Sequence, residues 1–168
     1  MNNRKKDLVI RTASLRDARA LTGIINSVVK EGRFTTFSKM SEKDCRKYMR
    51  SIGSNETILV AELGGKIVGF QFFERFPGGT EANKHVGTMG TFLSKGYRGR
   101  GIGPKMAERT FGWAKSKGFK KVVTWVFEDN VGGLRFYRRR GFKRVGKWKK
   151  QVKIDGKYHN EIVLEKFL

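Results

Sequence analysis

The sequence predicts an α/β (α+β) fold, in which helices flank a mixed central β-sheet. Turn signals join strand-like segments into antiparallel pairs at residues 57–75 and 142–165, which indicates a meander. Between them, residues 86–127 have the pattern of a strand, a helix and a second strand, which is typical of a crossover. Of the 168 residues 38% are hydrophobic, enough for one core, so we expect a single domain over residues 1–168.

The first elements are a short strand and two helices. Residues 8–11 have the composition of the strand. Ser14 and Asp17, three residues apart, form a capping box in front of apolar residues that recur at helical spacing. Ser41 and Asp44 repeat this start signal, so a second helix is expected behind them.

The only cysteine, Cys45, excludes an internal disulfide and a cysteine-rich metal site. It shares the apolar face of the second helix with Tyr48, Met49 and Ile52, which favours a core position over a catalytic one. The chain has two histidines, which argues against a zinc centre, so no metal is expected.

The middle of the chain is predicted to be strands. Residues 57–63 and 66–75 are rich in β-forming residues and flank Gly64-Gly65, which is typical of a hairpin. Residues 86–94 form the next strand, which is unusually rich in glycine and threonine.

The C-terminal half alternates helices and strands. The expected elements are a helix at residues 104–117 that Gly118 ends, a buried strand at 121–127, a short helix from Asn130 to Gly141, and a hairpin of strands 142–153 and 157–165 around Asp155-Gly156. The whole order is then β-α-α-β-β-β-α-β-α-β-β.

The charge is strongly positive, with 37 Lys and Arg against 15 Asp and Glu, a net charge of +22. Such a field attracts anions, for which the candidates are a phosphorylated cofactor, RNA, DNA or an anionic membrane. It argues mildly against polyamines or other small cations as substrates. The chain has no long apolar run and no secretory signal, so a cytoplasmic location without a membrane partner is the expectation.

A glycine-rich turn lies between the strand at residues 86–94 and the following helix, with the sequence Arg98-Gly99-Arg100-Gly101-Ile102-Gly103. Glycines let the backbone approach a ligand closely, and N–H groups at a helix N-terminus attract anions. Pro104 suits a first helical turn. The turn lacks the Gly-Lys-Ser/Thr of a Walker loop. It is not a good dinucleotide fingerprint either, although Glu128-Asp129 does follow the next strand, and this exclusion depends on the rest of the chain. It therefore predicts a phosphate site of another kind.

Three ordered motifs resemble the GCN5-related N-acetyltransferase (GNAT) superfamily. The glycine turn matches the family's Gln/Arg-x-x-Gly-x-Gly/Ala motif. Residues 126–130 resemble its strand ending in Asn, and residues 136–142 resemble its Tyr-x-x-x-Gly-Phe segment. The resemblance implies the acyl-CoA acyltransferase fold, a sheet of about six or seven strands flanked by about four helices. It also implies an acetyl-CoA-dependent N-acetyltransferase.

The resemblance assigns roles residue by residue. The residues expected to contact acetyl-CoA or coenzyme A are Phe92, Leu93, Arg98, Gly99, Arg100, Gly101, Ile102, Gly103, Asn130 and Tyr137. The backbone of Phe92 and Leu93 would bind the pantetheine arm, and the backbone of residues 98–103 would bind the pyrophosphate. Tyr137 would protonate the departing thiolate, although a core aromatic position also explains it.

The general base is less determined. Glu74, near the end of the third strand, is the first candidate, and His85, at the start of the fourth, is the second. A chain of water molecules is the alternative. A charged residue at a strand end is often simply solvated.

The acceptor is expected to be a primary amine, which a protein N-terminus, a lysine or a small molecule would supply. The loops at residues 31–39 and 77–84 would form its binding side. The densest basic block runs from Arg135 to Lys150 and fits the 3′-phosphate of coenzyme A, ribosomal RNA or a solvated face. Trp148 in that block suits base stacking, and strand alternation explains it equally well. A ribosome or RNA binder with little catalysis is therefore the rival function, and a monomer and a homodimer stay open.

Overall fold

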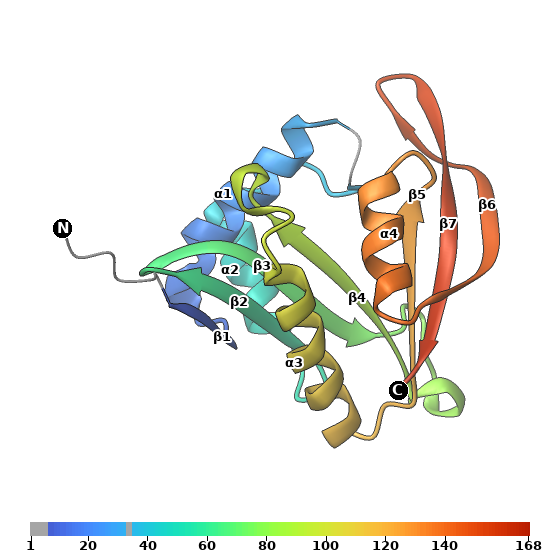
Figure 1. The fold of residues 1–168 in the computed structure, drawn as a ribbon, viewed down its shortest axis with the longest axis horizontal. Coiled ribbons are helices and arrows are strands. Elements are labelled where there is room, and N and C mark those ends of the chain that lie inside the picture. Colours follow the sequence, from blue (N-terminus) through green and yellow to red (C-terminus); the bar gives the residue numbers. More distant parts are fainter. Residues whose placement is uncertain (1–6, 33–34) are drawn as a thin grey trace.

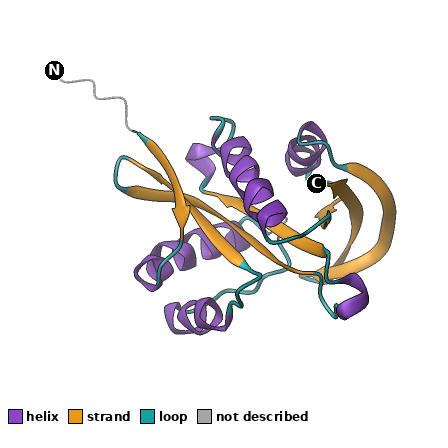
Figure 2. Ribbon diagram, turned by 90° about the horizontal axis from the view of Figure 1, so that it is seen from below, coloured by secondary structure: helices purple, strands orange, loops and turns teal. Residues whose placement is uncertain are grey.

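The computed structural model describes residues 7–32 and 35–168 and contains a seven-stranded sheet of strand order β1-β2-β3-β4-β5-β7-β6. All neighbouring pairs are antiparallel except β4 and β5, which are parallel. Figure 1 shows this arrangement, and Figure 2 shows helices on both faces of the sheet. The mixed α/β fold and the predicted element order are confirmed.

The strands are β1 (Leu8–Thr12), β2 (Thr57–Leu63), β3 (Lys66–Arg75), β4 (Val86–Leu93), β5 (Lys121–Phe127), β6 (Lys143–Ile154) and β7 (Lys157–Phe167). The helices are α1 (Ala18–Lys30), α2 (Glu42–Ser51), α3 (Ile102–Ser116) and α4 (Val131–Arg139). The predicted bounds differ from the observed ones by at most two residues, and α3 begins at residue 102 and not at 104. Gly101 adopts a left-handed conformation, φ 76°, and the helix begins directly after it.

The predicted capping box at Ser14 is present, although a short 3₁₀ turn (Leu15–Asp17) separates it from α1. The Asp17 side chain is buried and accepts hydrogen bonds from the Ser14 N–H at 2.7 Å and from both terminal nitrogens of Arg11 at 2.7 and 2.9 Å. The Arg11 guanidinium lowers the pKa of Asp17 below its usual value. This ion pair fixes the start of α1 to the end of β1.

We expect Asp17→Asn to lower the free energy of unfolding by about 2 kcal/mol near neutral pH, because charge-assisted hydrogen bonds are lost at a buried site. Since the folded-state pKa is lowered, the carboxylate stabilises the fold above its unfolded pKa, and this contribution is lost as the pH falls through the folded value. Urea unfolding measures the difference.

Asp44→Asn is the matched control, because Asp44 occupies the same place in the exposed capping site of α2. It should cost clearly less than Asp17→Asn. Equal losses for the two variants, or a loss at Asp17 that does not shrink in acid, would contradict this role of Asp17.

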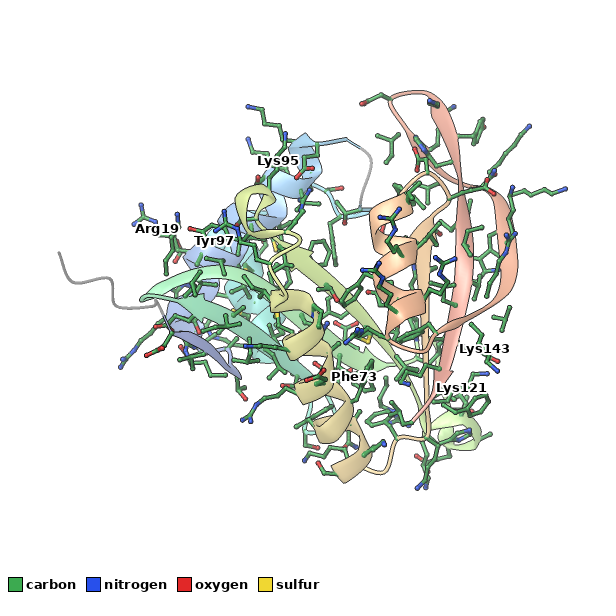
Figure 3. All side chains as sticks on the ribbon, viewed as in Figure 1. Arg19, Phe73, Lys95, Tyr97, Lys121 and Lys143 are labelled. Carbon is green, nitrogen blue, oxygen red and sulfur yellow. The ribbon has the colours of Figure 1, made fainter. Side chains whose placement is uncertain are left out.

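Each face of the sheet has its own core. On one face α1 and α2 cover a cluster that includes Phe70, Phe92 and the buried Cys45, which confirms the core position predicted for Cys45. On the other face α3 and α4 cover clusters around Phe73 and Val68. Phe73 lies beneath α3, where its ring contacts that of Trp113 at 5.6 Å (Figure 3).

The edge strand β6 is almost entirely exposed. Its lysines prevent edge-to-edge pairing with another sheet, which is a common function of charge at a sheet edge. The ring of Trp148 lies 5.8 Å from that of Trp125 on β5, as strand alternation predicts. No helix within residues 7–32 and 35–168 combines the length and apolar character that a membrane span requires.

Candidate active site

The cleft of the molecule begins where β4 and β5 separate. The two strands pair only at Val86–Lys121, Gly87–Val122 and Thr88–Val123 and diverge beyond this point (Figure 1). We call the point where β4 and β5 separate the fork. There the Thr124 hydroxyl of β5 donates to the Met89 carbonyl of β4 at 2.9 Å. A cleft of about 990 Å³ follows, lined by both strands, α4 and the glycine turn.

The backbone of β4 offers alternate residues to this cleft. The Ser94 N–H donates to the Val68 carbonyl and the Phe76 N–H to the Val86 carbonyl, so even-numbered residues of β4 direct their backbone groups toward β3. The N–H groups of Thr91 and Leu93 therefore point toward the open side. This alternation corrects the expectation for Phe92, whose backbone faces β3 and whose ring lines the cleft.

The glycine turn forms one wall of the cleft. Gly99 and Gly101 have φ values of 74° and 76°, and a Cβ atom at either position would meet no atom within 4 Å. Within the described part of the chain, no protein group accepts a hydrogen bond from the N–H groups of residues 99–103, and α3 has no side-chain N-cap. These free donors and the helix dipole suit a diphosphate-sized anion.

Arg98 has a different function from the one its charge suggests. Its guanidinium donates to both carboxylate oxygens of Glu31 at 2.6 and 2.8 Å, and its Nε donates to the Leu93 carbonyl at 3.0 Å. This charge is therefore largely neutralised, and the side chain fixes the turn to the end of α1. Arg100 is exposed and lies over the Tyr97 ring at 5.4 Å.

Helix α4 forms the opposite wall. The Asn130 side chain caps the helix by accepting from the Gly133 N–H at 2.9 Å. A Cβ atom on Gly133 would lie 2.7 Å from the Asn130 amide nitrogen, and one on Gly103 would lie 3.0 Å from the Phe136 ring. Glycines at these two positions thus allow the cap and the close approach of α3 and α4.

Tyr137 is buried and lines the cleft at the fork. Its hydroxyl interacts with the hydroxyls of Thr91 and Thr124 and with the Thr91 backbone. Burial raises the pKa of Tyr137 more than these hydrogen bonds lower it, so the phenol is protonated at neutral pH. Behind it, the Gln71 amide donates to the Thr91 hydroxyl at 2.7 Å and fixes this part of β4.

The two base candidates lie in different places. Glu74 lines the cleft on the α1–α2 face, where its carboxylate accepts a hydrogen bond from the Tyr48 hydroxyl. Burial is the main cause that raises the pKa of Glu74. His85 precedes Val86, at the end where β4 and β5 are paired, and does not line the cleft. Of these two candidates, Glu74 lines the cleft and His85 does not.

Two further carboxylates line the same cleft, the exposed Asp129 and the buried Glu161. Glu161 on β7 is 3% exposed, and burial raises its pKa. The sequence does not single out Glu161, because alternation within a predicted hairpin strand does not show which end of that strand approaches the cleft. Its only signal is an acidic residue next to the apolar run Ile162-Val163-Leu164.

Comparisons with known proteins agree with this geometry. The model of the acetyltransferase (GNAT) family matches residues 27–142. A Bacillus subtilis (strain 168) protein provisionally named a phosphinothricin acetyltransferase is 23% identical over 159 residues, covering 94% of this chain and 97% of that protein. The spermine/spermidine N(1)-acetyltransferase of the same strain is 33% identical over 85 residues, which cover 49% of this chain and 56% of that enzyme.

A similar solved structure is that of a GNAT superfamily phosphinothricin acetyltransferase from Sinorhizobium meliloti in complex with acetyl-CoA. Its TM-score is 0.89 at 22% identity, and the match covers 96% of this chain and 88% of that one. At this identity the likeness shows a shared fold.

Proposed function

As a member of the acetyltransferase (GNAT) family, this chain is an N-acetyltransferase that uses acetyl-CoA, and we propose that it moves the acetyl group to a primary amine by direct attack. One observation carries the proposal: the glycine turn presents unpaired N–H groups to the same cleft that the β4–β5 fork opens. We further propose that residues 1–168 act as one domain.

The proposed cofactor contacts follow from the open backbone groups. The N–H groups of residues 99–103 would bind the pyrophosphate, and those of Thr91 and Leu93 would bind the pantetheine arm and the acetyl carbonyl. Asn130 and the Phe92 ring line the passage between these sites. Arg135, Arg139 and Arg140 line the outer part of the cleft and suit the 3′-phosphate.

Acetyl-CoA supplies an activated acetyl thioester to this site. The Thr91 N–H faces the gap beside the Tyr137 hydroxyl, and it would exchange that contact for the acetyl carbonyl oxygen to stabilise negative charge there during attack. Tyr137 holds a proton on its hydroxyl and would transfer it to the departing thiolate. Glu74 remains the sequence-based proposal for the base.

The acceptor would bind on the α1–α2 face of the sheet, where Phe37, Phe72 and Trp125 line the cleft. The names of two relatives give phosphinothricin and the polyamines spermine and spermidine as acceptors, which supports a small amine. The exposed basic strand β6 also suits a polyanion, so an additional contact with RNA stays a prediction.

Acetyl-CoA at 100 times its dissociation constant should raise the free energy of unfolding by about 2.7 kcal/mol. Thermal unfolding with and without acetyl-CoA measures this stabilisation, and mass spectrometry of amine mixtures after incubation identifies the acceptor. Salt-sensitive RNA binding without any stabilisation by acetyl-CoA would instead support the rival function.

A further inference from the structure

Glu161 is a buried carboxylate that the proposed reaction does not yet use. It is 3% exposed and lines the cleft. Among residues 7–32 and 35–168, no group forms a hydrogen bond or an ion pair with it, although its oxygens are not sealed inside the protein. A buried charge without a partner destabilises a fold, so its presence calls for a functional reason.

The neighbours of Glu161 are apolar or aromatic. Phe127 on β5 and Trp148 on β6 lie directly opposite it, so their side chains share its face of the sheet. His159, two residues earlier on the same face, stacks on Phe127 with ring centroids 5.4 Å apart. Burial is the only cause that raises the pKa of Glu161, and no neighbouring charge contributes.

The strand register places Glu161 near the part of the cleft beside Thr91 and Tyr137, where the acetyl group is proposed to react. Thr88 pairs with Val123 in the parallel β4–β5 pair, so Thr91 is level with Val126. The next residue of β5, Phe127, is the partner of Glu161 on β7. Glu161 thus lies beyond β5 as seen from the Thr91 N–H, on the face of the sheet opposite Tyr137. Glu74 pairs with Thr88 at the closed end and already accepts from the Tyr48 hydroxyl.

Aromatic rings line the same cleft as Glu161. Phe37 contacts Phe92 and Phe72 at centroid distances of 5.5 and 6.2 Å on one side, and Trp125 and Phe127 line the other side. Aromatic faces and a carboxylate together attract an organic cation. This local negative charge opposes the positive field of the whole chain.

We propose that Glu161 binds the ammonium group of the acceptor and takes its first proton, and that the acceptor is a primary amine attached to an apolar or aromatic body. This inference rests on the proposed function. A primary amine has a pKa near ~10 and must lose a proton before it attacks. Of the carboxylates that line the cleft, Glu74 already accepts from Tyr48 and Asp129 is exposed, whereas Glu161 is buried and keeps free acceptor capacity.

The protons balance. The first amine proton passes to the Glu161 carboxylate and then to solvent. The nitrogen–carbon bond forms as the carbon–sulfur bond breaks, and the thiolate receives the proton of Tyr137. The second amine proton restores the phenol, so each turnover releases one proton, amide and coenzyme A.

The first experiment is calorimetric binding to the protein saturated with coenzyme A, which has no acetyl group to transfer. The probes are 2-phenylethylamine and the anion of the same shape, 3-phenylpropionate. We expect the wild-type protein to bind the amine in preference to the anion. Glu161→Gln should weaken amine binding at least about tenfold, as expected for the loss of a charge-assisted contact, and leave coenzyme A binding unchanged.

Glu165→Gln is the matched control, because Glu165 lies four residues along the same face of β7, paired with Lys121 outside the cleft. It should not affect amine binding. Equal amine binding by the wild type and Glu161→Gln, or tighter binding of the anion, overturns the inference. A wild-type protein that fails to bind coenzyme A refutes the proposed function itself.

The second measurement is thermal stability against pH. A carboxyl group whose folded pKa is raised destabilises the fold as the pH rises through that value. Glu161→Gln should therefore unfold at a higher temperature than the wild type at about pH 8 and should match it in acid. A variant that is less stable at both pH values and keeps full amine binding would show a merely structural carboxylate.

Discussion

Replacement of Gly101 by glutamate is expected to abolish acetyl-CoA binding. Gly101 is the residue before α3, with φ 76°, and it lines the cleft together with Gly99, Ile102 and Gly103. A glutamate there places negative charge beside the proposed pyrophosphate position, and like charges at close range cost several kcal/mol. The affinity should fall by at least about 100-fold, which corresponds to about 2.7 kcal/mol.

The variant protein should still fold, which makes this test informative. A Cβ atom at position 101 meets no atom within 4 Å, so the only cost to the fold is the left-handed conformation, about 1–2 kcal/mol. Gly101→Ala carries the same strain without the charge. It should lose clearly less affinity for acetyl-CoA than Gly101→Glu.

Gly112→Glu is the second control, because Gly112 lies on the same helix, is exposed and has open space around its Cβ position. It introduces the same charge away from the cleft and should stabilise α3, since glycine inside a helix costs about 1 kcal/mol relative to alanine. Calorimetry with acetyl-CoA compares the three variants. Equal affinity of Gly101→Glu and Gly112→Glu would contradict a pyrophosphate site at this turn.

The sequence was sufficient to predict the fold, because its signals were local. Ser14, Ser41, Gly64-Gly65 and Asp155-Gly156 mark starts and turns that depend only on neighbouring residues, and the structure has each of them. The helix α3 begins two residues before the predicted start at Pro104, because the left-handed Gly101 determines its first residue.

The site was predicted less completely, because it depends on contacts between distant segments. The Arg98 side chain binds Glu31, which is 67 residues earlier, so its charge is not free for a phosphate. The direction of the backbone groups of Phe92 depends on the register of β4 with β3. Glu161 reaches the cleft only because β7 inserts between β5 and β6, and no local pattern indicates that insertion.

Replacement of Tyr137 by phenylalanine is expected to lower kcat by about 10²- to 10³-fold, the range for loss of a general acid. The acetyl-CoA dissociation constant should change by less than about threefold, because the proposed phosphate contacts lie in another segment. The ring is kept, with its contacts to Phe136 and Phe142 at 5.0 and 5.1 Å. Only the hydrogen bonds of one hydroxyl are lost, at a cost of about 1 kcal/mol, so the variant should fold.

The pH dependence distinguishes an acid from a packing residue. The phenol acts when protonated, and burial raises the pKa of Tyr137, so the wild-type rate should not fall until the pH passes the ordinary tyrosine value of about 10. The Phe variant should lack this alkaline fall and should remain slow throughout. Tyr158→Phe, at a residue that is 54% exposed and does not line the cleft, should match the wild type. If the wild type and Tyr137→Phe turn over equally at every pH, the thiolate takes its proton from water, and Tyr137 only supports the wall of the cleft.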